Sequence, residues 1–142
     1  TPSYIIVSVT ATSLTAGQKL QIVCYNESSD GLPSILAWYQ EFTVGTTTGI
    51  YEVAISGKSI PTTGYAIGVA NPSGNAGSVT FASVNGTDSY FASGFSLYGR
   101  PTLSVATSTT PPSDLSSYTV AGTSGSTVIQ AGVVTSPLIM CR

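Results

Sequence analysis

The pattern that decides the fold stands near the start of the chain, in Tyr4-Ile5-Ile6-Val7-Ser8-Val9-Thr10. β-branched residues dominate this stretch, and they are typical of strands because they fit a pleated, half-buried surface. Successive side chains of a strand point to opposite faces, so Ile5, Val7 and Val9 share one face and the residues between them share the other. The stretch therefore predicts a strand over 4–10.

The following residues repeat this alternation between turn signals. Ala16-Gly17 predicts a turn. In 19–24, Leu20, Ile22 and Cys24 alternate with the residues between them, which suits a strand with one buried face. Similar short patterns continue to the end of the chain. We expect further strands over 35–42, 50–55, 65–69, 78–84, 89–98, 103–106, 118–120, 127–130 and 138–141.

Turn-forming residues separate these strands. Asn85-Gly86 matches the favoured two-residue hairpin turn, so 78–84 and 89–98 are expected to pair. The segment 107–113, which contains Pro111-Pro112, is predicted to be a loop or an extended segment. With about nine to eleven short strands and no long helical periodicity, the sequence predicts one all-β domain over 1–142, an antiparallel β-sandwich.

Two stretches of the chain resemble parts of the immunoglobulin-like family. LTAGQKLQIVC at 14–24 is similar to its early turn and second strand, and LAWYQ at 36–40 is similar to its third strand. Asp88-Ser89-Tyr90 stands where that family has an Asp-to-Tyr corner. The resemblance implies an immunoglobulin-like or related Greek-key topology. The chain departs from the family at Phe91-Ala92, where the second cysteine of the family is expected. A weaker similarity, over 15–22, is to a family of fungal cell-wall domains.

Charged side chains are scarce, and this limits the chemistry that the chain can perform. Of 142 residues, 4 are Lys or Arg, 6 are Asp or Glu and none is His, and the formal net charge is −2. His is the usual proton carrier near neutral pH, and phosphate groups and anionic lipids require basic clusters. We therefore expect no catalytic residue, no cofactor and no nucleic-acid partner. No apolar run reaches the roughly 18 residues that cross a bilayer, so we expect no membrane span.

The one enzyme class left open is a glycosidase that uses two carboxylates. Glu41 and Glu52 would face each other if the strands that carry them paired, and Glu27 and Asp30 fall in one predicted loop. Solvated surface acids are the simpler explanation of all four. A calcium site would need oxygen ligands such as Asp30 and Asp88, at a spacing that fits no known loop pattern. We expect no metal site.

The cysteines and two glycosylation motifs indicate a secreted protein. Cys24 and Cys141 are the only cysteines, and their wide spacing fits none of the short zinc or redox patterns. Two unrelated buried thiols are one interpretation, and a disulfide that ties the C-terminal end to an early strand is the preferred one. Asn26-Glu27-Ser28 and Asn85-Gly86-Thr87 are N-glycosylation motifs, predicted to lie on surface loops. Together these features predict an extracellular location.

Tyrosine is the most informative residue type for binding. The chain has 8 Tyr against 1 Trp and 4 Phe, and a phenol combines an apolar ring with a polar tip that suits sugar rings and protein contacts. A place in the core or on ordinary sheet surface is the alternative for each aromatic residue, and we expect Trp38 in the core. The predicted ligand-binding residues lie near turns or in polar loops, and they are Tyr25, Tyr51, Tyr65, Tyr98, Arg100, Asn71, Asn75 and Asp88.

Two functions are consistent with these features. The preferred one is a secreted, non-enzymatic, lectin-like protein that binds a glycan, a cell-surface protein or cell-wall material. The alternative is a structural subunit of an extracellular filament or wall layer, which self-associates through its edge strands. In that case 4–10 would serve as the donated strand, because it is rich in β-branched residues.

Overall fold

The computed structural model describes residues 3–29, 33–72, 74–85, 109–115, 135–137 and 139–141, and within these residues it contains strands, turns and loops but no helix. The strands are β1 (Tyr4–Thr12), β2 (Lys19–Glu27), β3 (Pro33–Thr43), β4 (Gly49–Ala54), β5 (Tyr65–Ala70), β6 (Val79–Phe81), β7 (Ser83–Asn85), β8 (Thr135–Pro137) and β9 (Ile139–Cys141). All of their pairings are antiparallel. The predicted all-β class is confirmed for this part of the chain.

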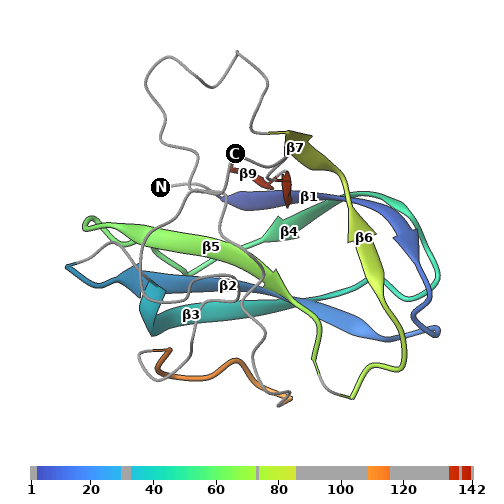
Figure 1. Ribbon diagram of the computed structural model, residues 1–142, viewed down its shortest axis with the longest axis horizontal. Coiled ribbons are helices and arrows are strands. Elements are labelled where there is room, and N and C mark those ends of the chain that lie inside the picture. The colour runs from blue at the N-terminus through green and yellow to red at the C-terminus, as the bar shows by residue number, and fades with distance from the viewer. Residues whose placement is uncertain are drawn as a thin grey trace.

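β1 is the central strand of the first sheet, called here the β1 sheet (Figure 1). β4 pairs along one edge of β1. The other edge is shared, with β9 beside 5–7 and β6 beside 9–12. Because both edges of β1 are paired within the chain, 4–10 does not fit the predicted role of a donated strand.

β2 is the central strand of the second sheet, called here the β2 sheet. β3 pairs along the length of β2, with breaks in register on either side of Tyr25. β5 pairs along the opposite edge, from Gln21 facing Ala70 to Asn26 facing Tyr65. Among the described residues, β3 and β5 are therefore the two edge strands of this sheet.

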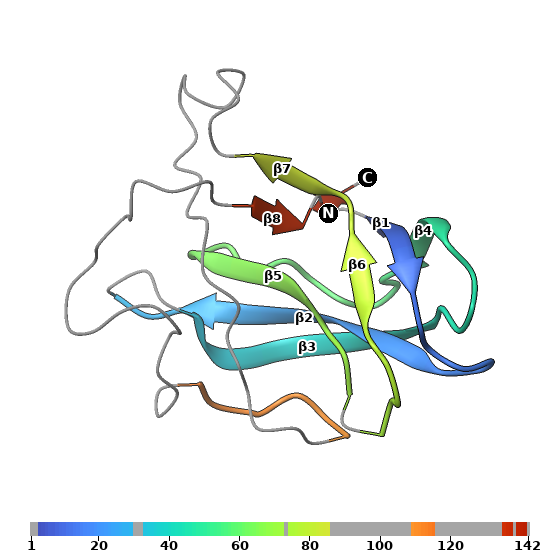
Figure 2. The same cartoon turned by 45° about the vertical axis from the view of Figure 1, so that its right-hand side comes forward.

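A short third sheet places Asn85 in a strand and not in the predicted turn. β7 follows β6 after a single residue and pairs with β8, so that Asn85 lies opposite Thr135 (Figure 2). Asn85 is therefore a strand residue, and its partner comes from the far end of the sequence. The predicted strands at 89–98, 103–106, 118–120 and 127–130 lie outside the described residues.

The β1 and β2 sheets share one apolar core. The alternating pattern correctly placed Ile5 and Val7 of β1, and Ile22 and Cys24 of β2, on inward faces. Burying an aliphatic side chain stabilises a fold by roughly 1.5–3 kcal/mol, so this cluster holds the two sheets face to face. Its buried members are Ile5, Val7, Ile22, Cys24, Trp38, Val53 and Ile55.

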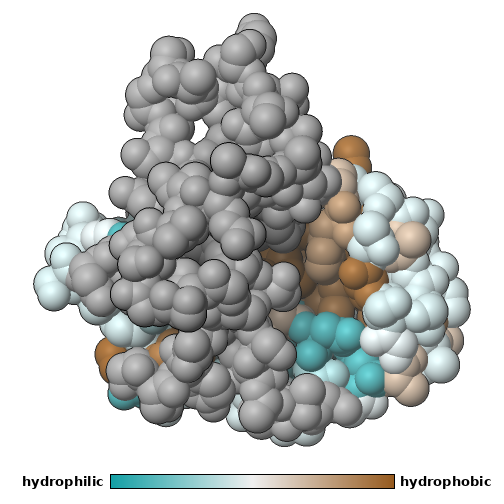
Figure 3. Space-filling view, in the orientation of Figure 1, coloured by the Kyte–Doolittle hydropathy of each residue, from teal (hydrophilic) through white to brown (hydrophobic). Residues whose placement is uncertain are grey.

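A second cluster extends the core toward the turn between β1 and β2. The predicted turn at Ala16-Gly17 is confirmed, and within it Gly17 takes φ +80°, a conformation that favours glycine. Figure 3 shows apolar atoms between β5 and β6, where the partly buried Val69 and Phe81 pack against both clusters. The buried members of the second cluster are Val9, Leu14, Leu20 and Val44.

The outer face of the β2 sheet is buried as well. Gln21 is 1% exposed and Tyr25 is 6% exposed, although both point away from the shared core. The segment 109–115, orange in Figure 1, covers them, and Leu115 packs against Val23 and Tyr25. The prediction of one buried face for β2 is therefore wrong, because a segment from far along the chain covers the second face.

Candidate functional site

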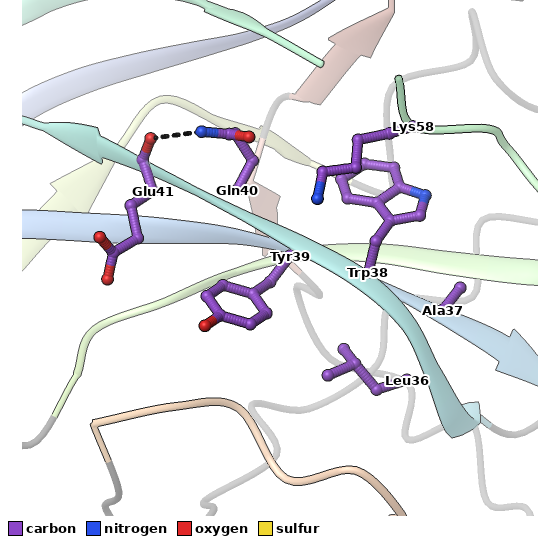
Figure 4. A pocket seen from close by; sticks show the side chains of 7 residues that line it. All are labelled: Leu36, Ala37, Trp38, Tyr39, Gln40, Glu41 and Lys58. Atoms are coloured by element: carbon purple, nitrogen blue, oxygen red, sulfur yellow. Dashed lines mark hydrogen bonds between the residues drawn. The ribbon is translucent and has the colours of Figure 1, made fainter. Parts of the chain in front are cut away.

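An open depression of about 580 Å3 lies along β3 (Figure 4). Because successive side chains of a strand point to opposite faces, a depression lined by consecutive residues follows the edge of the strand. Figure 4 shows Trp38, Gln40 and Lys58 on one side of the β3 ribbon and Leu36 and Tyr39 on the other. The lining residues are Leu36, Ala37, Trp38, Tyr39, Gln40, Glu41 and Lys58.

Trp38 fixes one side of the depression. Its ring belongs to the shared core, as predicted, and its Nε1 donates a hydrogen bond to the carbonyl oxygen of Ser59 at 2.8 Å. The neighbouring Lys58 is held through its backbone, because its amide donates to the carbonyl oxygen of Ile55 at 2.9 Å. Lys58 and Trp38 both line the depression, and Figure 4 shows them on the same side of β3.

Glu41 gives the other side of the depression its polar character. Its carboxylate accepts a hydrogen bond from Gln21 Nε2 at 3.4 Å and lies 3.5 Å from Lys19 Nζ. The Lys19 and Glu41 side chains are 53% and 44% exposed, so this ion pair contributes little to stability. Gln40 Nε2 donates to the carbonyl oxygen of Glu41 at 3.1 Å. The carboxylate therefore stays accessible to a ligand.

The N-terminal part of the β3 edge already pairs with a second segment. The amide of Leu36 donates to the carbonyl oxygen of Ser113 at 2.9 Å. The amide of Leu115 donates to the carbonyl oxygen of Ser34 at 2.8 Å. Within the described part of the chain, 37–43 pairs with β2 alone. The depression thus begins where the intramolecular pairing of this edge ends.

Two of the predicted binding tyrosines have structural roles. Tyr25 was expected to be exposed, but it is buried and its hydroxyl donates to the carbonyl oxygen of Pro112 at 2.9 Å. Tyr51 is partly buried, and its hydroxyl donates to the carbonyl oxygen of Thr47 at 2.7 Å. Both hydroxyls donate to backbone carbonyls, so the prediction that these two tyrosines are fully exposed is wrong, and their binding role stays a prediction.

Three other predicted binding residues, Tyr65, Asn71 and Asn75, do not line the depression. Asn75 Nδ2 donates to Asn71 Oδ1 and to the carbonyl oxygen of Lys19, both at 2.7 Å. Asn71 Nδ2 donates to the carbonyl oxygen of Gly77 at 3.0 Å, so the two amides hold the loop between β5 and β6. Tyr65 is exposed at the start of β5. Three further residues lie outside the described part: Tyr98, Arg100 and Asp88.

The predicted carboxylate pair does not form. Glu41 lies on β3 and Glu52 on β4, and these strands belong to different sheets that are not hydrogen-bonded to each other. Glu27 lies on β2 and not in a loop, and Asp30 lies outside the described residues. Among the residues with described positions, no group of three or more His, Cys, Asp or Glu side chains is placed to hold a metal ion.

The predicted glycosylation and disulfide residues lie on strands. Asn26 is in β2 and Asn85 is in β7, so the prediction that both stand on loops is wrong. Cys24 is buried in the shared core. Cys141 lies on β9 opposite Ile5, which belongs to the same core. The backbone brings the end of the chain beside the cluster that contains Cys24, and the disulfide itself stays a prediction.

Sequence patterns did not single out several residues of the depression. The sequence indicates Leu36, Ala37 and Gln40 as residues of a strand, within the stretch LAWYQ, and Lys58 as one of the few cations, but it assigns none of them to a site. The adjacent polar residues Gln40 and Glu41, in an otherwise apolar strand, were a signal that could have indicated an edge strand. Nothing in the local sequence indicated that Lys58 would lie beside β3.

Comparisons with models of protein families, with curated proteins and with solved structures find no match for this chain. The described residues also contain no helix with the length and apolar character that a membrane crossing requires.

Proposed function

We propose that this chain is a secreted, non-enzymatic binding domain with a β-sandwich architecture, and that it binds an extended polypeptide along the edge of β3. The observation that carries the proposal is the position of the depression, which is lined by 36–41 and continues the edge that 113–115 already pairs with. In the chain itself, 113–115 forms an isolated antiparallel bridge and two backbone hydrogen bonds with this edge, which supports the proposal.

The chemistry of a sheet edge supports this proposal. An edge strand presents unpaired backbone N–H and C=O groups, and an extended peptide satisfies them by becoming the next strand. Side chains on both faces of β3 then contact alternate side chains of the ligand. Tyr39 and the Trp38 edge offer apolar contacts, while Glu41 and Lys58 offer charges of both signs.

A pair of alanine substitutions tests the proposal. Ala37→Lys places a charged, mobile side chain at the edge of the depression, and such residues block strand addition. Ala54→Lys is the matched control, because Ala54 is also exposed but lies on β4 of the other sheet. Linear peptides selected from a displayed library against the wild-type chain are then titrated against both variants. We expect Ala37→Lys to weaken binding at least about tenfold and Ala54→Lys to leave it unchanged.

Backbone hydrogen exchange locates the bound peptide. Strand addition should slow exchange of amides within 37–43, because they gain carbonyl partners. Selected peptides that bind equally well to both lysine variants, or that protect only amides outside β3, would contradict the proposal.

A glycan is the second candidate ligand, and the mixed lining of the depression favours it. Tyr39 supplies a ring for stacking, and Glu41 and Lys58 supply groups that bind sugar hydroxyls. Binding on a glycan array that is lost in Tyr39→Ala but kept in Tyr65→Ala would establish this function. An array without any binding, with the peptide result positive, would eliminate it.

The filament alternative uses the same edge but requires a second copy of the chain. Light scattering of the purified protein would then report dimers or larger species, and Ala37→Lys would convert them to monomers. A wild-type chain that stays monomeric at high concentration excludes this alternative while leaving peptide binding open to test.

A further inference from the structure

One end of the β2 sheet carries an exposed aromatic residue beside a glycosylation motif. Asn26 of β2 lies directly opposite Tyr65 of β5 in the antiparallel register. Residues paired in this way point to the same face, with Cβ atoms about 4.5–5.5 Å apart. Tyr65 is 43% exposed, and its hydroxyl has no hydrogen-bond partner among the described residues. Its ring therefore has room for a group attached to Asn26.

The Asn26 side chain lies at the surface and makes a hydrogen bond that glycosylation would leave intact. It is partly exposed, and its Nδ2 donates a hydrogen bond to the carbonyl oxygen of Ile35 at 3.4 Å. A primary amide carries two N–H donors, so a sugar on Nδ2 replaces one hydrogen and leaves the other for Ile35. Ser28, the hydroxyl residue of the motif, is also partly exposed.

We propose that Asn26 is an occupied N-glycosylation site and that its first sugar packs on the ring of Tyr65 and covers Ile35. The carbon-bound hydrogens of a pyranose ring form an apolar face that matches an aromatic ring, and its hydroxyls can reach the phenol oxygen. Ile35 is 49% exposed, so the glycan would shelter two large apolar side chains from water. The inference is independent of strand addition, because neither Asn26 nor Tyr65 lines the depression.

The modification uses an activated sugar as its co-reactant. A lipid-linked oligosaccharide diphosphate supplies the glycan in the secretory pathway. The bond between the anomeric carbon and the phosphate oxygen breaks, and a bond between that carbon and Asn26 Nδ2 forms. Nδ2 loses one proton, the lipid diphosphate leaves, and no oxidation or reduction occurs.

Expression of the chain behind a secretory leader, in eukaryotic cells and in an Asn85→Gln background, isolates the Asn26 site. Glycopeptide mass spectrometry should find a glycan on Asn26 in this protein and none in Ser28→Ala, which removes the motif but keeps the asparagine. Secreted, folded protein with Asn26 unmodified would overturn the proposal.

The packing on Tyr65 is tested by thermal unfolding before and after enzymatic trimming or removal of the glycan. We expect removal to lower the unfolding midpoint by about 3 °C with Tyr65 or Tyr65→Phe, and to have no effect with Tyr65→Leu. The N-acetyl methyl resonance of the first sugar gives a second measurement, which does not depend on stability. It should shift upfield with Tyr or Phe at position 65 and lose that shift with Leu. Equal midpoints and equal methyl shifts in all three proteins would overturn the packing.

Discussion

Gln21 donates from Nε2 to the carbonyl oxygen of Thr109 at 2.8 Å, across 88 positions of sequence, and its side chain is 1% exposed. A buried amide is costly unless it is hydrogen-bonded. This bond therefore ties the segment 109–115 to the centre of the β2 sheet, next to the edge on which the candidate binding site lies.

Replacing Gln21 with Leu tests this bond together with the longer one from Gln21 Nε2 to the Glu41 carboxylate at 3.4 Å. The substitution keeps the buried volume but removes the donor, so we expect a loss of about 1 kcal/mol in the free energy of unfolding. Urea denaturation measures it as a lower midpoint at an unchanged slope. Gln40→Leu is the control, because among the described residues the Gln40 side chain bonds to the carbonyl oxygen of its neighbour Glu41 and not to a distant segment. Equal losses of unfolding free energy in the two variants would show that the bond to Thr109 stabilises the fold no more than the local bond of Gln40.

Tyr25→Phe removes a second contact between the β2 sheet and this segment. The phenol hydroxyl donates to the carbonyl oxygen of Pro112 at 2.9 Å, and its loss should cost about 1 kcal/mol in unfolding free energy. The amide of Leu115 should also exchange faster, because the segment opens more easily. Tyr65→Phe, made in unglycosylated protein, changes an exposed ring and should alter neither measurement. A Tyr25→Phe variant with wild-type stability would contradict the expected role.

Gly77→Ala should destabilise the loop between β5 and β6. Gly77 takes φ +140°, and an added Cβ would lie 2.5 Å from the carbonyl oxygen of Ser13. Backbone strain of this kind costs roughly 1–3 kcal/mol, so we expect a clearly lower unfolding midpoint. Gly74→Ala in the same loop is the control, because its Cβ would meet no atom within 4 Å. If Gly77→Ala and Gly74→Ala have the same unfolding midpoint, the close approach to Ser13 does not require glycine at position 77.

The disulfide between Cys24 and Cys141 is tested by alkylating the unfolded, unreduced protein. We expect no alkylation and a mass 2 Da below that of the reduced chain, because a disulfide lacks two hydrogens. Cys141→Ser should then destabilise the oxidised protein by roughly 4–5 kcal/mol, the value for a loop of more than a hundred residues. The same substitution should have little effect under reducing conditions. Alkylation of both cysteines without reduction would contradict the prediction.

The alternation of apolar and polar side chains predicted the first five strands of this fold correctly. Strands at 4–10, 19–24, 35–42, 50–55 and 65–69 correspond to β1 to β5, because alternation of apolar side chains depends on neighbours two residues apart and requires no knowledge of distant contacts. Asn85 lies in β7 and not in the turn that Asn85-Gly86 predicted, and the pairing expected between 78–84 and 89–98 involves residues outside the described part. Pairing with Thr135 is a contact between distant residues, and a local pattern cannot indicate it.

The candidate site was less predictable than the fold. The sequence indicated Tyr25 and Tyr51 as exposed because each stands near a turn, but both hydroxyls bind backbone carbonyls that the turns and the segment 109–115 bring to them. The sequence also predicted that Glu41 and Glu52 would face each other on paired strands. That pairing does not occur, because β3 and β4 belong to different sheets.

The amino-acid sequence alone determined that this chain forms strands with the apolar face of β1 turned inward, because side-chain alternation is a property of neighbouring residues. Tertiary structure decided that β2 is buried on both faces and that 37–43 remains an open edge within the described residues. The physical reason is the path of 109–115. This segment first crosses the outer face, where it buries Gln21 and Tyr25, and then pairs with the first part of the β3 edge. Among the described residues, it leaves the rest of that edge unpaired.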